Sequence, residues 1–118
     1  MKETIGEITS IPLSPALKTE GLVFVSGQVP TDESGTVVEG VEAQTRLVME
    51  KIRTLLEGAG SSIDKVVKTT VFLTDKADFA VMNAVYSEYF PEVPPTRSTI
   101  QCELMIDIKV EIEAIALA

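Results

Sequence analysis

Apolar side chains recur along the chain with two different periods, which predict where strands and helices lie. Residues 21–27 form a continuous β-prone run between two glycines, followed by a turn-rich segment, a pattern typical of a central strand. Over residues 41–59 apolar side chains return every three or four positions. This spacing predicts an amphipathic helix that ends at Gly58 and Gly60.

The second half of the chain continues with both periods. Residues 66–74 are mostly β-branched and alternate between two faces, which predicts another strand. A helix is predicted over about residues 76–90, with Asp75 as its N-cap and a proline directly after it. Two further strands are predicted over residues 97–104 and 109–117, and they are so close in sequence that we expect an antiparallel hairpin.

The two-residue period also predicts which side chains share a face of the sheet. The last strand has small apolar residues on one face, which we expect to pack against the helices, while Glu111 and Glu113 point the other way. In the strand before it, we expect Cys102 to face the helices as a core residue. Arg97 and Thr99 are then expected on the same face as the two glutamates.

The order of the elements predicts an α+β fold in which one sheet carries two helices on a single face. The other face of this sheet has no cover within the chain and mixes charged with apolar residues. Because such a surface is unfavourable in water, we expect it to be an interface between subunits, with a solvated sheet face as the alternative.

The composition is that of a single domain spanning residues 1–118, with 45% hydrophobic residues and a net charge of −8. This acidic charge repels phosphate backbones and anionic lipids, so we expect neither a nucleic acid nor a membrane as partner. The chain has no histidine and one cysteine. We therefore expect no metal, no cofactor and no disulfide, and we predict a cytoplasmic protein because no signal or anchor segment is visible.

A few polar residues have the chemistry and the position of a site. Arg97 follows two prolines where a loop enters a strand, and a guanidinium binds a carboxylate through two parallel hydrogen bonds. Glu111 and Glu113 could position a water or carry a proton. For all three, the alternative is an ordinary surface or interface ion pair.

Two further positions are weaker candidates for ligand binding. Ser26 and Gly27 end the first strand, and the glycine would let a ligand approach backbone donors closely, although an ordinary strand end is the alternative. Asn83 lies inside the second predicted helix, where its amide could reach a substrate or simply be exposed.

Several segments together resemble one protein family. PTRSTI at residues 95–100, followed by VEIEAIA at residues 110–116, resembles the C-terminal signature of the RidA/YjgF family of reactive-intermediate deaminases. The resemblance extends over about residues 12–117. Further matching segments are FVSGQVP at 24–30, AQTR at 43–46, VKTTVF at 67–72 and DFAVMN at 78–83.

The resemblance implies a chorismate-mutase-like two-layer sandwich with one mixed sheet, assembled as a homotrimer with a central β-barrel and clefts between subunits. It implies hydrolysis of enamine or imine acids, of the 2-iminopropanoate, 2-iminobutanoate or 2-aminoacrylate type, to 2-oxo acids and ammonia. In this family, Arg97 matches the arginine that binds the substrate carboxylate and Glu111 the glutamate that orients the water. The residues implied to line the same cleft are Ser26, Gly27, Asn83 and Thr99.

Two departures from the family pattern leave the substrate open. LSPAL at residues 13–17 replaces a Gly-Pro-Tyr segment, so the tyrosine that often lines the cleft is missing, and Glu103 stands where a small residue is usual. A trimeric module that binds carboxylates or proteins without catalysis is the alternative function. In the expected hairpin, Arg97 and Glu111 lie four residues out of register, so they would bracket a ligand or meet across a subunit boundary.

Overall fold

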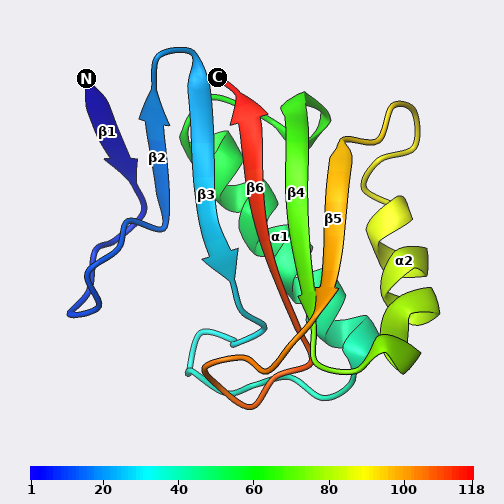
Figure 1. The fold of residues 1–118 in the computed structure, drawn as a ribbon. Helices are drawn as coiled ribbons and strands as arrows, with labels where there is room; N and C mark the ends of the chain where they lie inside the picture. The colour runs from blue at the N-terminus through cyan, green and yellow to red at the C-terminus, as the bar shows by residue number, and fades with distance from the viewer.

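The computed structural model describes residues 1–118, which form one six-stranded sheet with two helices on one of its faces (Figure 1). The predicted α+β fold, with a mixed sheet in two layers, is confirmed. The strand order is β1-β2-β3-β6-β4-β5, and only the β4–β5 pair is parallel. The elements are β1 (Lys2–Ile5), β2 (Ala16–Thr19), β3 (Leu22–Gln28), α1 (Val41–Gly58), the 3₁₀ turn η1 (Ile63–Lys65), β4 (Val66–Leu73), the 3₁₀ turn η2 (Lys76–Asp78), α2 (Phe79–Ser87), β5 (Thr96–Gln101) and β6 (Val110–Leu117).

The core lies between the sheet and the two helices. It contains 21 buried apolar residues, which come mainly from the central strands of the sheet, from the inward stripe of α1, and from α2 and the residues that follow it. That stripe recurs at the three- and four-residue spacing seen in the sequence, as Val48, Met49, Ile52 and Leu56 are at most 1% exposed. Burial of this stripe therefore holds α1 on the sheet.

The expected hairpin of the last two strands is wrong. β5 pairs in parallel with β4, while β6 inserts between β3 and β4 (Figure 1). The physical reason is burial: alternate residues of β6, from Val110 to Ala116, are at most 3% exposed, whereas alternate residues of β5 are exposed. The more apolar strand takes the centre, and α2 supplies the crossover that parallel pairing of β4 and β5 needs.

The expected face of Arg97 is also wrong. Arg97 stands beside Thr69 of β4, which is 1% exposed and faces the helices, so Arg97 and Thr99 are on the helix side. Cys102 is only half-buried and is not a core residue. Alternation sorts residues into two sets, but on a polar edge strand it does not say which set faces inward.

The face of the sheet away from the helices, here called the open face, carries both charged and apolar side chains. Its residues include Phe24, Phe72, Ile100, Glu111, Glu113, Ile115 and Leu117. Phe24, Ile100 and Leu117 are 40 to 49% exposed. The mixed, uncovered sheet face that the sequence predicts is thus present, although Arg97 is not part of it.

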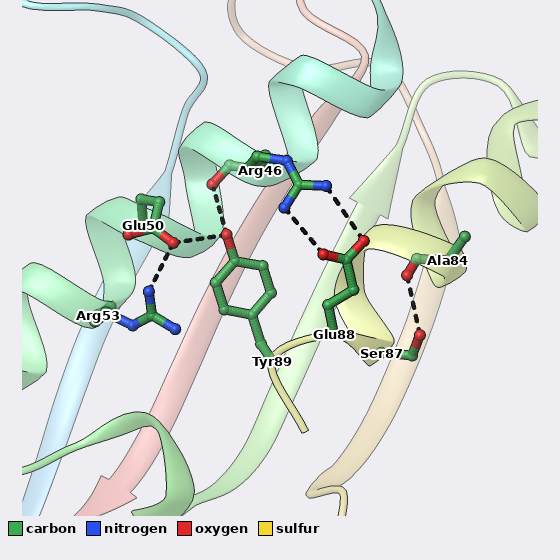
Figure 2. A network of polar contacts seen from close by, with 7 residues as sticks. All are labelled: Arg46, Glu50, Arg53, Ala84, Ser87, Glu88 and Tyr89. Atoms are coloured by element: carbon green, nitrogen blue, oxygen red, sulfur yellow. Dashed lines mark hydrogen bonds and ion pairs between the residues drawn. The ribbon is translucent and has the colours of Figure 1, made fainter. Parts of the chain in front are cut away.

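A polar network joins the outer surface of α1 to the end of α2 (Figure 2). Arg46 donates two hydrogen bonds to the Glu88 carboxylate, at 3.1 and 3.2 Å. Glu50 accepts hydrogen bonds from Arg53 at 2.8 Å and from the Tyr89 hydroxyl at 2.7 Å. Both arginines of this seam therefore have a carboxylate partner within the chain.

Candidate functional site

Arg97 is held in the seam between β5 and α2. Its guanidinium carbon lies 5.7 Å from the centre of the Phe79 ring and 4.9 Å from that of Tyr86, so the cation stacks on two aromatic faces. The side chain is half-buried, and none of the three ion pairs of the structure includes it. This cation is therefore available for a carboxylate from outside the chain.

Tyr86 lies beneath Arg97 and is itself bound to the sheet. Its hydroxyl lies 2.7 Å from Thr69 Oγ1, and both residues are buried. Burial raises the pKa of the Tyr86 phenol above its usual value, and the hydrogen bond with Thr69 and the nearby Arg97 oppose this only in part. The phenol is thus neutral at physiological pH.

Asn83 and Thr99 belong to the same seam as Arg97. Asn83 comes four residues after Phe79 and three before Tyr86, which places it on the same side of α2. Its Oδ1 is buried and has no hydrogen-bond partner in the chain. Thr99 lines a small cavity of about 290 Å³ together with Phe79. The structure therefore brings three of the predicted site residues to one seam.

Glu111 is on the open face, at the other side of the sheet. It is half-buried, and burial raises the pKa of its carboxyl above the usual value, with a smaller contribution from the charge of Glu113. No arginine, lysine or amide hydrogen-bonds to it. A carboxyl with a raised pKa and no partner is suited to exchange protons with a water or a substrate.

The absence of a side chain at Gly27 leaves space for the Glu111 carboxylate. A Cβ built on Gly27 would overlap Glu111 Oε2, so the space left by the missing side chain is filled by the carboxylate. The sequence left open whether this glycine admits a ligand to the backbone or is an ordinary strand end. In the structure the Glu111 carboxylate lies against it, and the pair is found where β3 breaks its regular pairing with β6.

Ser26 is tied to the segment that replaces the family's Gly-Pro-Tyr. Its hydroxyl donates to the Ser14 carbonyl at 2.7 Å, and its N–H donates to the Pro15 carbonyl at 2.9 Å. A cavity of about 670 Å³ opens beside it, lined in part by Leu13 and Glu113. Ser26 therefore sits at the edge of a hollow on the Glu111 side of the sheet.

The two candidate catalytic residues are far apart within one chain. Along β4, Arg97 is level with Thr69 and Glu111 with Phe72. That offset of three residues is about 10 Å at ~3.3 Å per residue, and an odd offset puts the two on opposite faces. The expected hairpin register was wrong, yet the structure also shows no direct contact between Arg97 and Glu111 within the chain.

The contact of Phe79 and Tyr86 with Arg97 was not predicted from the sequence. Their seven-residue spacing puts both rings on one side of a helix, but the sequence gives no sign that Arg97 is opposite them. The structure places no group of three or more His, Cys, Asp or Glu side chains so that they could hold a metal ion. None of its helices has the length and apolarity needed to span a membrane.

Comparison with known proteins places the chain in a family. Residues 4–118 match the family model described as Endoribonuclease L-PSP. A RutC family protein of Pyrococcus abyssi is 48% identical over 108 residues, covering 89% of this chain and 85% of the relative. The 3-aminoacrylate deaminase RutC of Acinetobacter baylyi is 43% identical over 108 residues, covering 89% and 86%. Reactive Intermediate Deaminase A, chloroplastic, of Arabidopsis thaliana is 44% identical over 108 residues, covering 89% and 58%.

Solved structures agree with the sequence matches. The Rid family protein YyfA of Yersinia pestis superposes with a TM-score of 0.95 at 36% identity, covering 100% of both chains. RidA from an Antarctic Psychrobacter superposes with a TM-score of 0.93 at 37% identity, covering 98% of this chain and 99% of that one. The chain therefore belongs to the RidA/YjgF family of imine and enamine deaminases, whose family model carries the description Endoribonuclease L-PSP.

Proposed function

We propose that this protein hydrolyses reactive enamine and imine acids to the 2-oxo acid and ammonia. The substrates are of the 2-iminopropanoate, 2-iminobutanoate or 2-aminoacrylate type. The observation that carries the proposal is Arg97, a half-buried guanidinium fixed on two aromatic rings without a carboxylate of its own. Two relatives whose names describe deaminases support the reaction class.

In the proposed reaction, Arg97 binds the carboxylate of the substrate and Glu111 orients a water. The water oxygen adds to the imine carbon while Glu111 takes a proton from it, giving a tetrahedral amino alcohol. Glu111 returns the proton to the nitrogen. The carbon–nitrogen bond then breaks as the hydroxyl group loses its proton to the departing ammonia, so that the 2-oxo acid and an ammonium ion leave. A protonated imine is already electrophilic, so the step needs mainly orientation, one water and a proton path.

Asn83, Thr99, Ser26 and Gly27 take supporting roles in this proposal. Turning of the Asn83 amide would bring its buried, unpartnered Oδ1 to accept a hydrogen bond from the substrate N–H, which keeps the nitrogen protonated. Thr99 lines the small cavity beside Phe79, and Ser26 lines the hollow on the Glu111 side of the sheet. In the proposed assembly these two residues come from opposite sides of a cleft between subunits. Gly27 leaves room for the reactive carboxyl of Glu111.

The separation of Arg97 from Glu111 supports a homotrimer with shared sites. In the proposed assembly, the α2–β5 seam of one protomer meets the open face of the next, and the open faces together form a central barrel. The exposed apolar residues of the open face, among them Phe24, Ile100 and Leu117, favour such burial. Light scattering that returned a monomer of 12.7 kDa at micromolar concentration would contradict the assembly.

Mixing inactive subunits tests whether the site is shared. Arg97→Ala and Glu111→Gln subunits are each expected to be inactive, and mixed trimers regain sites that carry both native residues. If subunit exchange is confirmed by mass and no activity returns, each cleft takes both residues from one chain.

The enzymatic proposal is tested with an imine made in place. A dehydratase that generates 2-aminoacrylate is coupled to the protein, and the release of pyruvate and ammonia is followed. We expect acceleration over spontaneous hydrolysis. No acceleration, with pyruvate still bound, would instead indicate the alternative of a carboxylate-binding module without catalysis.

The charge and the cysteine content favour a small-molecule substrate and a reducing compartment. A net charge of −8 and the absence of histidine weigh against RNA as substrate, because phosphate backbones are repelled. The only cysteine, Cys102, is free. We therefore propose the cytoplasm as the site of action, although one relative carries the description chloroplastic.

A further inference from the structure

The two aromatic rings beside Arg97 come from one stripe of α2. Phe79 and Tyr86 are seven residues apart, which is about two turns of an α-helix. Both rings lie within 6 Å of the guanidinium carbon of Arg97, the range in which a cation is attracted to the face of an aromatic ring. With no carboxylate bound to Arg97 within the chain, these rings are the contacts that fix the guanidinium.

The ring of Tyr86 is itself fixed by the neighbouring strand. Its hydroxyl shares a buried hydrogen bond of 2.7 Å with Thr69 Oγ1. Thr69 is the β4 residue directly beside Arg97 in the parallel pair. Thr69 thus anchors the Tyr86 ring through its hydroxyl, and it is also the strand neighbour of Arg97, whose guanidinium lies over that ring. Turning the ring would leave two buried hydroxyls without partners, which is unfavourable.

We infer that Phe79 and Tyr86 form an aromatic slot that sets the direction of the Arg97 guanidinium before a carboxylate binds. The inference rests on the proposed function, since it takes Arg97 as the group that receives the substrate carboxylate. A two-pronged hydrogen bond requires the guanidinium and carboxylate planes to coincide. An arginine free to move would lose rotamer freedom on binding, whereas the slot imposes that order beforehand. Phe79 and Tyr86 are positioning residues.

Phe79→Leu is the variant that tests the slot. Phe79 is 44% exposed, so the fold tolerates its loss better than that of the buried Tyr86. We expect KM for the imino acid to rise about 3- to 10-fold, with kcat changed less than about twofold, because the carboxylate is held equally in the ground and transition states. Phe79→Trp, which retains a ring over the cation, is expected to restore KM.

Val81→Ala is the matched control on the same helix. Val81 is 43% exposed, close to the 44% of Phe79, but it comes two residues later on the helix, so its side chain is turned about 200° from that of Phe79. This variant is expected to keep the wild-type KM. A rise in KM as large as that of Phe79→Leu would show a general effect of the α2 surface and would overturn the slot.

A readout that needs no catalysis separates the slot from the proposed function. The Arg97 Nε–Hε resonance is titrated with pyruvate in the wild type and in Phe79→Leu. We expect the dissociation constant of pyruvate to rise about 3- to 10-fold in the variant and to return in Phe79→Trp. If it stays within about 1.5-fold of wild type, the slot is overturned while the deaminase can stand. If the wild type hydrolyses no imine, the proposed function fails and the titration alone decides the slot.

Discussion

The two seams of α2 use similar residues and reach opposite outcomes. Toward α1, Arg46 and Arg53 are each paired with a glutamate, and Arg53 also stacks 5.0 Å above the Tyr89 ring (Figure 2). Toward β5, Arg97 has the aromatic rings but no glutamate. The first seam is complete within the chain and serves the fold. The second has no carboxylate for Arg97, and a carboxylate is the group that the proposed substrate would supply.

The same contrast holds for the acidic residues. Glu50 and Glu88 have arginine partners, and Arg46 lowers the pKa of the Glu88 carboxyl below its usual value. Glu111 has no cationic partner, and burial raises the pKa of its carboxyl. The pKa of Glu88 is lowered because its charged form is paired, whereas the pKa of Glu111 is raised because burial disfavours its charged form.

The largest effect is expected when the unpaired arginine is changed. Arg97→Lys replaces a planar fork by a point charge, so kcat/KM on 2-aminoacrylate should fall at least about tenfold, at ~1.4 kcal/mol per decade. The same change in the paired seam, Arg46→Lys, should leave kcat/KM unchanged. Equal kinetics in the two variants would show that the carboxylate is held elsewhere.

The next test displaces the unpaired carboxylate without removing it. In Gly27→Ala the new methyl group overlaps Glu111 Oε2, so the carboxylate must move and kcat should fall by up to about tenfold. Gly58→Ala is the control, because its Cβ would meet only Ile5, at 3.4 Å. A wild-type kcat in Gly27→Ala would mean that the position of the Glu111 carboxylate does not matter.

Replacing Glu111, which has no partner, and Glu88, which is paired, by glutamine should change thermal stability in opposite directions. Between the unfolded pKa and the raised folded pKa of Glu111, the native state binds more protons, so stability falls as the pH rises through the folded pKa. Glu111→Gln should therefore lose activity yet raise Tm slightly at pH 7. The gain should vanish in acid, where the wild-type carboxyl is protonated.

Glu88→Gln is the comparison for that measurement. The folded pKa of Glu88 is lowered by Arg46, so its stabilisation is present above the unfolded pKa and is lost as the pH falls through the folded pKa. This variant should lower Tm at pH 7 by a small amount. If Glu111→Gln and Glu88→Gln shift Tm at pH 7 in the same direction, the contrast between the Glu111 and Glu88 carboxyls is wrong.

The smallest effect is expected in the paired seam itself. Arg46 and Glu88 are 44% and 56% exposed, so Arg46→Ala should lower Tm only slightly. The difference from wild type should shrink as salt is added, because exposed charges are screened. A difference in Tm that persists at high salt would show that packing of the Arg46 stem, rather than charge, holds the seam.

The strands and helices were largely predictable from periodicity, whereas strand pairing was not. The helix over residues 41–59 agrees with α1 to one residue, because one clear stripe faces the core. The short polar strands β1 and β2 have no such pattern and were missed. The predicted helix over residues 76–90 divides into η2 and the shorter α2. Closeness in sequence favoured a hairpin of β5 and β6, but the burial of alternate residues in β6 decided the order.

The chemistry of single residues was enough to select Arg97 and Glu111 as site candidates, but not to predict all of their surroundings. Arg97 and Glu111 were chosen for their chemistry and for a family resemblance, and both prove to be charged groups without partners. The face of Glu111 was predictable, because clearly apolar residues alternate with it along β6. The face of Arg97 was not, because an edge strand with polar residues on both sides leaves its orientation to its neighbour β4. The rings around Arg97 depend on the same neighbour, so they emerged only from the structure.

The central place of β6 also bears on how the chain is synthesised. β6 is the last strand along the chain, yet it joins β1–β3 on one side to β4–β5 on the other. Until it leaves the ribosome, the edges of β3 and β4 that it will cover remain without partners, and unpaired edges invite pairing with other chains. We therefore expect nascent chains to need protection until β6 has been synthesised, and expect truncation within β6 to prevent folding altogether.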